Sequence, residues 1–381
     1  MSDHMKRMSV GFPRMHKERG ERRDFLPTFV RRISELGVPV ILEQGYGSGM
    51  DISARSYTGT TKNARFGSHE EAYSQDLVIV LRYPNDDELP LLRSGSCLMS
   101  MIHFPTRPGR IKQLKEFNLE AVSLDSVKDD TGRRLVENLR AVGWNGVETA
   151  FMVLGKTFPG LENRNRRPVH VTILGSGGVG AHAMQAAIRY GDTKLWERMV
   201  RQAVPGVRVT VVDYDVTCIE HEMLGILEET DVLVDATQRP DPTKVVIPND
   251  WIAHLPEHAV ILDLSVDPYD CTENSPTIKA IEGIPHGDLD QYIYYPEDKA
   301  YDLLPGCVST RHRRATVSCY SWPGIHPEDC MGIYGKQVFP LVRVLMEAGG
   351  PTNIDPRGTF FHRALSRAML SHWPTAQGES V

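Results

Sequence analysis

The sequence lacks any long hydrophobic run. Of its 381 residues, 41% are hydrophobic and 24% are charged, and no apolar stretch approaches the ~18 residues that a membrane-spanning helix needs. The opening residues, MSDHMKRMSV, contain no apolar segment of the kind found in secretory signals. We therefore expect a cytoplasmic protein that has no membrane partner.

Cysteine pairs and excess positive charge are also missing. No C-x-x-C pair is formed by the six cysteines, which stand at positions 97, 218, 271, 307, 319 and 330; this favours reduced thiols over a disulfide or zinc framework. The HEMLG segment that starts at His221 lacks the second histidine of an H-E-x-x-H zinc motif, so we predict no metal site. The net charge of −6 provides no basic surplus, and we expect no nucleic-acid partner.

The chain does contain two series of strand-like and helix-like segments. The first series includes the strand-like runs MSVGFP, VPVILEQG, DLVIVLRYP and CLMSMIHFP, with the helix-like LPTFVRRISELG among them. The second series includes the strand-like runs VHVTIL, VRVTVVD, DVLVDAT and AVILDLS. This alternation predicts an α/β fold with parallel sheets flanked by helices.

A glycine-rich loop opens the second series, in the segment VHVTILGSGGVGAHAMQAAI. Gly175, Gly177 and Gly180 fit the spacing G-x-G-x-x-G, between a run that predicts a strand and a run that predicts a helix. In a dinucleotide site the first glycine permits a tight turn, the second lets the backbone approach a pyrophosphate, and the third allows close packing of helix and strand. We predict that this loop binds NAD, with a structural glycine turn as the alternative. The loop also contains Ser176, Gly178 and Val179.

Two further residues complete the predicted cofactor site. Asp213 ends the strand-like VRVTVVD, where its carboxylate can bond ribose hydroxyls and would repel a 2′-phosphate, which favours NAD over NADP. It lies 33 positions after Gly180 instead of the usual ~20, so the segment GDTKLWERMVRQAVPG must fill the gap. Thr237 ends the strand-like DVLVDAT and is the last residue of the predicted set.

Several motifs resemble alanine dehydrogenase and its relative, the lysine-forming saccharopine dehydrogenase. GFPRMHKERGERRDFLP resembles the family's N-terminal motif, whose arginine holds the substrate carboxylate and is Arg22 here. MIHFP is similar to the segment with the catalytic histidine, here His103, and LDLSVDPYDCTENSP contains Asp267 at the position of an acid near the nicotinamide. AVGWNGVETAF and SWPGIHPEDC look more like the saccharopine side. The resemblance extends from about Met8 to Gly349 and implies a superfamily, not a substrate.

The resemblance breaks at VLRYP. Where the family has a lysine this chain has Arg82, and Tyr83 stands where the saccharopine side has an acid. An arginine can bind a carboxylate or stabilise an oxyanion, but it cannot readily exchange a proton. A plain ion pair with Asp86 or Asp87 is the alternative role for Arg82. The predicted catalytic set is His103, Arg82 and Asp267, and the predicted substrate-binding set is Arg22, Arg82 and Asp125.

The resemblance implies two Rossmann-like domains separated by a cleft, one of which binds NAD. The apolar final helix needs a partner, which in the family is the first domain, so we expect a substrate domain of residues 1–150 plus 315–381 and an NAD-binding domain of residues 151–314. The polar segment FPGLENRNRRP is typical of a connection.

The implied activity is NAD-dependent chemistry at a CH–NH bond. It is either oxidative deamination of an alanine-like amino acid or reductive condensation of a 2-oxo acid with an amine. The added arginine and the saccharopine-like segments favour a larger, dicarboxylic substrate. A catalytically impaired NAD-binding sensor is the alternative, and the sequence leaves a homo-oligomer open.

Overall fold

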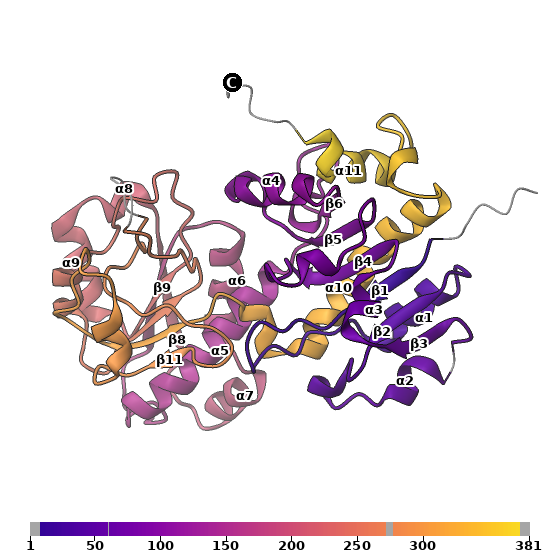
Figure 1. Cartoon of the computed structure of the whole chain (residues 1–381). Helices are drawn as coiled ribbons and strands as arrows, with labels where there is room; N and C mark the ends of the chain where they lie inside the picture. Colours follow the sequence, from indigo (N-terminus) through magenta and orange to yellow (C-terminus); the bar gives the residue numbers. More distant parts are fainter. Residues whose placement is uncertain (1–7, 60, 272–276, 374–381) are drawn as a thin grey trace, which may run out of the picture. The chain divides into compact units, whose positions relative to one another are not determined.

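The computed structural model describes residues 8–59, 61–271 and 277–373 (Figure 1). These residues form two units. The first unit contains the described residues up to Asn138 and from His326 onward, and the second contains Leu139–Ile325. Each unit has its own six-stranded sheet. The predicted α/β fold of two parallel sheets flanked by helices is therefore confirmed.

The first sheet is entirely parallel, with the strand order β3-β2-β1-β4-β5-β6. Its strands are mostly continuous apolar runs because both faces are covered by helices. The strands are β1 (Val10–Phe12), β2 (Val40–Glu43), β3 (Ala64–Gly67), β4 (Leu77–Arg82), β5 (Cys97–Met101) and β6 (Glu120–Ser123). The helices are α1 (Pro27–Ser34), α2 (Ala54–Thr58), α3 (His69–Tyr73), α4 (Pro108–Glu116), α10 (Pro327–Glu347) and α11 (Phe360–Ala368).

The end of the described chain belongs to the core of this first unit. Helix α10 buries Met331, Val338 and Val342 in the same cluster as Phe12 of β1 and Phe29 of α1. The sequence predicts the same packing partner, the first domain, for this apolar helix.

The second sheet has the order β11-β12-β10-β9-β7-β8. Only the short β11 runs antiparallel to its neighbour. The strands are β7 (Val169–Leu174), β8 (Val207–Val212), β9 (Val232–Asp235), β10 (Val260–Asp263), β11 (Ile293–Tyr294) and β12 (Ala315–Ser318). The helices are α5 (Leu139–Thr157), α6 (Gly178–Ala187), α7 (Thr193–Arg201), α8 (Tyr214–Thr217) and α9 (Glu220–Glu229).

The boundaries between the two units in the sequence differ from the expected 150/151 and 314/315. Helix α5 is continuous from Leu139, and its Val147, Ala150 and Phe151 are buried in the core of the second unit. The helix therefore belongs wholly to that unit. Strand β12 is likewise part of the second sheet, so the second unit extends to Ile325.

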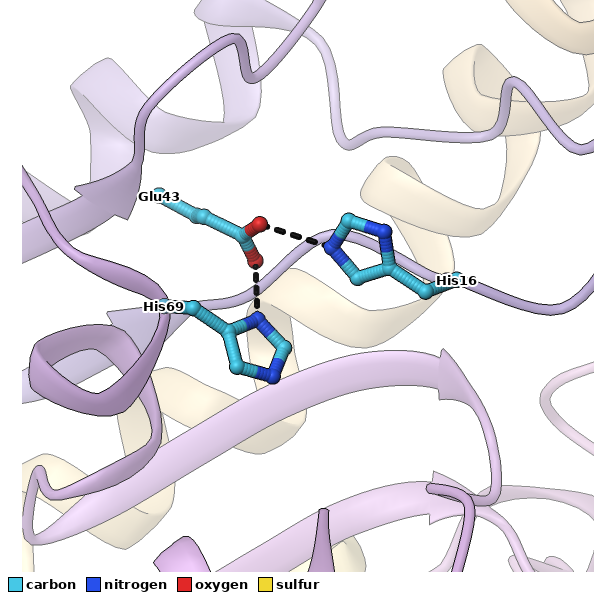
Figure 2. A group of neighbouring side chains, drawn as sticks. All are labelled: His16, Glu43 and His69. Carbon is cyan, nitrogen blue, oxygen red and sulfur yellow. Dashed lines mark hydrogen bonds and ion pairs between the residues drawn. The ribbon is translucent and has the colours of Figure 1, made fainter. Parts of the chain in front are cut away.

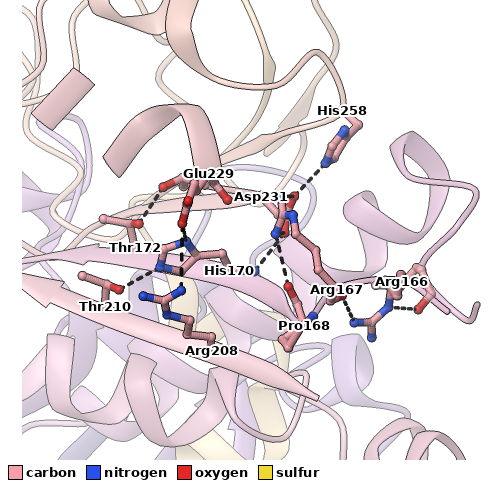
Figure 3. A network of polar contacts seen from close by, with 12 residues as sticks. Arg166, Arg167, Pro168, His170, Thr172, Arg208, Thr210, Glu229, Asp231 and His258 are labelled. Atoms are coloured by element: carbon pink, nitrogen blue, oxygen red, sulfur yellow. Dashed lines mark hydrogen bonds and ion pairs between the residues drawn. The ribbon is translucent and has the colours of Figure 1, made fainter. Parts of the chain in front are cut away.

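The segment Phe158–Pro168, expected to connect the domains, lies inside the second unit and is tied to the amino end of its sheet (Figure 3). Both terminal nitrogens of Arg167 donate to the buried carboxylate of Asp231, at 2.8 and 2.9 Å. The same carboxylate is bonded by the backbone N–H of His170 and by Nε2 of His258, each at 2.8 Å. Because Asp231 is buried, these bonds compensate a charge that would otherwise be costly.

The cysteine prediction was wrong for one pair. Cys271 and Cys307 form a disulfide with a Cα–Cα distance of 6.6 Å, whereas the sequence analysis expected only reduced thiols. The two residues are 36 positions apart, so no local spacing signals the pair. The other four cysteines are free thiols. Within the described ranges, the helices are all too short or too polar to cross a bilayer.

Candidate active site

The glycine loop of the second unit has the geometry that the sequence predicts at two of its glycines. Gly175 follows β7 with φ of +96°, in the left-handed region, and a Cβ there would lie 2.7 Å from the carbonyl oxygen of Ala236. A Cβ on Gly180 would lie 2.1 Å from the carbonyl oxygen of Gly175. Packing of the loop against β9 and of α6 against the loop therefore excludes a side chain at both positions.

Gly177 is different, because a Cβ there would meet no protein atom within 4 Å. The residue is exposed and is the N-cap of α6, where no side chain caps the helix. Ser176 and Gly178 are exposed beside it, and Val179 is half-buried. A helix amino end with open space in front of it suits an anionic pyrophosphate. The loop therefore fits the dinucleotide that its sequence predicts.

Three of the predicted cofactor residues, Gly175, Asp213 and Thr237, line one cavity of about 700 Å³. Asp213 follows the end of β8, and its Oδ2 accepts a hydrogen bond of 2.7 Å from the hydroxyl of Ser176. This bond is the main cause of the lowered pKa of Asp213. The long spacing from Gly180 is filled by the extra helix α7, so the acid still reaches the loop.

Buried acids underlie this cavity and were not found from the sequence. The backbone N–H and the hydroxyl of Thr237 donate to Oδ1 of Asp235, at 3.0 and 2.7 Å. Burial, followed by the charge of Asp263, raises the pKa of Asp235 to about 6. Asp263 in turn pairs at 2.6 Å with Lys279, and both side chains are fully buried. This network fixes the ends of β9 and β10, and the loop that follows β9 lines the cavity.

Asp267 was predicted near the nicotinamide, and the structure pairs it with a partner that the sequence analysis missed. Its Oδ2 accepts a hydrogen bond of 2.7 Å from Arg239, which lines the cavity. The preceding residue, Val266, has φ of +53°. A β-branched residue rarely adopts this conformation, and such strain is concentrated at functional sites.

In the first unit the structure brings His103 and Asp125 together. His103 lies just beyond β5, is half-exposed and has φ of +60°. Its backbone N–H donates to Oδ1 of Asp125 at 3.0 Å, and its ring Nδ1 lies 3.4 Å from Oδ2. Burial alone would raise the pKa of Asp125, but the His103 contacts and the Ser123 hydroxyl outweigh it and lower that pKa to about 2. The acid is thus an anion that orients the imidazole.

Arg82 lies among carboxylates instead of standing alone. Its NH1 bonds Glu18 at 2.9 and 3.0 Å and Glu21 at 3.1 Å; neither Asp86 nor Asp87 is among these acids. Glu21 is also paired with the buried Arg23. Burial alone would raise the pKa of Glu21, but Arg23 and then Arg82 outweigh it and lower that pKa to about 2. Arg82 is therefore part of a partly buried charge network.

The predicted carboxylate binder, Arg22, is exposed, and its side chain makes no ion pair with another described residue. It packs against the backbone at Gly49, where a Cβ would lie 3.1 Å from the Cβ of Arg22. The buried arginine of this motif is its neighbour Arg23. The structure therefore leaves Arg22 accessible to an anionic ligand.

A second cavity, of about 830 Å³, lies in the first unit and carries cations that the sequence analysis did not select. Lys17 is half-buried, and burial followed by the charge of Arg82 lowers its pKa. Its Nζ donates to Oδ1 of Asn85. Arg110 lies over the ring of Tyr83, 4.5 Å from the centroid, and burial followed by the charge of Arg107 lowers its pKa. The cavity's cations are Lys17, Arg107, Arg110 and Lys112.

Comparison with known proteins agrees with this architecture. Residues 11–140 match the family described as the alanine dehydrogenase/PNT N-terminal domain. An alanine dehydrogenase of Bilophila wadsworthia is 23% identical over 286 residues, which cover 71% of this chain and 74% of that protein. The alpha subunit of an NAD(P) transhydrogenase from Haemophilus influenzae is 25% identical over 190 residues, 48% of this chain but only 37% of that protein.

Solved structures show the same fold. An L-alanine dehydrogenase superposes with a TM-score of 0.66 at 18% identity, over 95% of this chain and 94% of that one. A transhydrogenase from Sinorhizobium meliloti superposes with a TM-score of 0.63 at 16% identity, over 89% of this chain and 95% of that one. The matched N-terminal domain, the alanine dehydrogenase relatives and the shared two-sheet fold all support a relationship to the alanine dehydrogenase superfamily.

Proposed function

We propose that the protein is an NAD-dependent oxidoreductase that acts on the CH–NH or CH–NH₂ bond of an amino acid. The observation that carries this proposal is the His103–Asp125 pair at the carboxyl edge of the first sheet, in a chain whose second unit has a loop suited to a dinucleotide. The similarity to alanine dehydrogenases supports the same reaction class.

The residues of the chain have separable roles in this chemistry. Bound NAD would supply the hydride acceptor for oxidation of the carbon that bears the nitrogen. His103, half-exposed and with Nδ1 toward Asp125, presents Nε2 for the proton that leaves or reaches the reacting nitrogen or water. Asp125 holds the orientation of the ring.

Lys17 is our candidate for the task of the lysine that Arg82 replaces. An arginine does not readily exchange a proton, whereas a lysine with a lowered pKa does. Lys17 is half-buried in the first-unit cavity, and its pKa is lowered by burial and by Arg82. Arg82 then acts through its charge, on Lys17 and on the carboxylates that it binds.

The charge of the cavity supports a substrate with more than one carboxylate. Lys17, Arg107, Arg110 and Lys112 line it, against the acidic Asp86 and Glu116. Arginine forks bind carboxylates in two-point contacts. This favours a dicarboxylic amino acid, or a 2-oxo acid joined reductively to an amine as in saccharopine-type chemistry, over alanine itself. A homo-oligomer and a cytoplasmic location remain part of the proposal.

A substrate panel tests this function. The full chain is assayed by NADH absorbance with individual amino acids in the oxidative direction, and with pairs of a 2-oxo acid and an amine in the reductive direction. We expect turnover with at least one dicarboxylic substrate and its loss in His103→Ala. NAD binding without turnover on the whole panel would favour the alternative, a sensor that has lost catalysis.

A further inference from the structure

Three metal-ligand side chains meet at the carboxyl edge of the first sheet, outside the residues assigned to the reaction (Figure 2). His16 belongs to the loop after β1, Glu43 is the last residue of β2, and His69 is the first residue of α3. Nε2 of His16 lies 2.7 Å from Oε1 of Glu43, and Nδ1 of His69 lies 3.0 Å from its Oε2. The two imidazole rings thus face opposite oxygens of one carboxylate.

This carboxylate needs a positive partner. The side chain of Glu43 is only 7% exposed, and its Oε2 also accepts the backbone N–H of Arg14 at 2.7 Å. A buried carboxylate is costly unless it is paired with a cation or coordinates a metal. Here the groups that face it are two imidazoles, which supply a charge only if they are protonated, and otherwise present ring nitrogens suited to a metal.

The other face of His69 carries an independent indication. Its Nε2 lies 4.0 Å from Oε1 of Glu88, a carboxylate whose side chain is 6% exposed. This oxygen is buried and accepts no hydrogen bond of ordinary geometry from the described residues, although the carboxylate of Glu88 also acts on the hydroxyl of Tyr73. A carboxylate beside the outer nitrogen of a histidine fixes the tautomer of a metal-bound imidazole once the two come within hydrogen-bond distance.

The tautomer of His69 decides whether a cation is needed beside Glu43. If Nε2 of His69 carries the proton toward Glu88, the lone pair of Nδ1 points at Glu43. Two lone pairs would face each other at 3.0 Å, which is repulsive unless one positive ion bonds to both atoms. His16 offers a third ligand atom from the other side, and the three ligand atoms all lie within 4.8 Å of one another.

We propose that His16, Glu43 and His69 bind a divalent first-row transition-metal ion such as Zn²⁺, with Glu88 orienting His69. Zinc bonds to imidazole nitrogen and carboxylate oxygen at about 2.0–2.2 Å, so small side-chain adjustments bring three ligands onto one ion, and water completes the coordination. The half-exposed His16 leaves an entry path from solvent.

The ion would join three segments that the chain otherwise connects only through loops. The loop of His16 also borders the proposed substrate cavity, because Asn85 donates to the carbonyl oxygen of His16 at 3.1 Å and accepts from Lys17. A metal at this place stabilises the edge of the cavity by binding only the folded state. It takes no part in the proposed hydride transfer.

The test is metal binding by the full chain, read without any assay of turnover. The protein is dialysed against a chelator and titrated with Zn²⁺ by calorimetry and with Co²⁺ by visible absorbance. We expect one ion per chain, a cobalt spectrum of low coordination number and a higher melting temperature with Zn²⁺. His16→Ala, Glu43→Gln and His69→Gln should each weaken binding by at least about tenfold, and Glu88→Gln by about 10- to 100-fold.

Two controls keep the result interpretable. His221→Ala changes a histidine that is 82% exposed and lies in the other unit, and it should leave zinc affinity unchanged. His16→Ala alters a half-exposed side chain, so it should fold, as circular dichroism will show. Absence of a one-to-one complex, or equal zinc affinity in the folded His16→Ala variant, would overturn the proposal, whatever the outcome of the substrate panel.

Discussion

The backbone N–H of His103 donates to one oxygen of Asp125 at 3.0 Å, while its ring Nδ1 lies 3.4 Å from the other oxygen. One carboxylate therefore fixes both the backbone and the ring of the histidine. Because the residue has φ of +60°, this double contact also stabilises an uncommon backbone conformation.

This arrangement predicts distinct effects for the two residues. His103→Ala should lower kcat/KM by about 10²- to 10⁴-fold and change the shape of the pH–rate profile, because an acid–base group is lost. Asp125→Asn keeps the shape of the side chain but removes its charge, so it should lower kcat and move the pH–rate profile along the pH axis. Steady-state kinetics from pH 5 to 9 with a substrate from the panel checks both. An unchanged profile in His103→Ala would exclude this histidine as the acid–base residue.

Arg82 is expected to contribute to both stability and catalysis, and one substitution tests both contributions. Arg82→Ala removes a cation from Glu18 and Glu21, and because Glu21 keeps its pair with Arg23, the free energy of unfolding should fall by about 1–3 kcal/mol. It should also reduce kcat/KM by about 30- to 1,000-fold if its charge stabilises the transition state. Arg82→Lys should recover part of both. Denaturant unfolding and kinetics measure them, and a catalytically normal Arg82→Ala would place Arg82 outside the active site.

Lys17 should behave differently, because the proposal assigns it a proton. Lys17→Ala should lower kcat by about 10²-fold or more, and Lys17→Arg should not restore it, since arginine keeps the charge without exchanging the proton. The matched control is Lys115→Ala, an exposed lysine of α4 that is not among the residues lining the cavity. Full rescue by arginine would show that Lys17 supplies charge only.

The position of Asp213 predicts which cofactor binds more tightly. NAD should bind on the order of tenfold or more tightly than NADP, because the carboxylate beside the loop would face a 2′-phosphate. Asp213→Ser should narrow the difference, while Asp215→Ser, in the first turn of α8 beyond the strand end, should not. Calorimetric titration of each variant with both cofactors gives the ratios. Equal affinities of the parent for NAD and NADP would remove Asp213 from the ribose site.

Asp24 predicts how stability changes with pH. Burial raises its pKa from 3.8 to about 6, although its Oδ2 accepts the backbone N–H of Gly47 at 2.7 Å. The folded state therefore holds this proton more tightly than the unfolded state, so stability falls as pH rises through the window from 3.8 to 6. At pH 7 the loss is on the order of 2–3 kcal/mol.

Asp24→Asn removes this titration and keeps an oxygen for the Gly47 amide. Relative to the parent, the variant should gain stability between pH 4 and pH 7. Denaturant unfolding of both proteins at three pH values measures the difference. Parallel stability curves would show that Asp24 has the same pKa in the folded and unfolded chains.

The sequence by itself determined the strands, the glycine loop and the place of Asp213. These features are local: a continuous apolar run predicts a buried strand, and the loop's conformation follows from glycines at Gly175 and Gly180 that no side chain can replace. The strands that it missed lack a strong apolar run: β11 has two residues, β3 is partly exposed, and β6 and β12 are buried but include polar residues.

Only the tertiary structure decided which charged groups meet. Glu18 and Glu21, which pair with Arg82, are 64 and 61 positions away from it in the sequence. His16 and His69 are 27 and 26 positions from Glu43, and Cys271 is 36 positions from Cys307. Hydrophobic periodicity encodes which faces are buried but carries no information about the partners of polar side chains. Those partners are set when parallel strands bring the loops at their carboxyl ends to one edge of a sheet, and burial there makes each pairing energetically decisive.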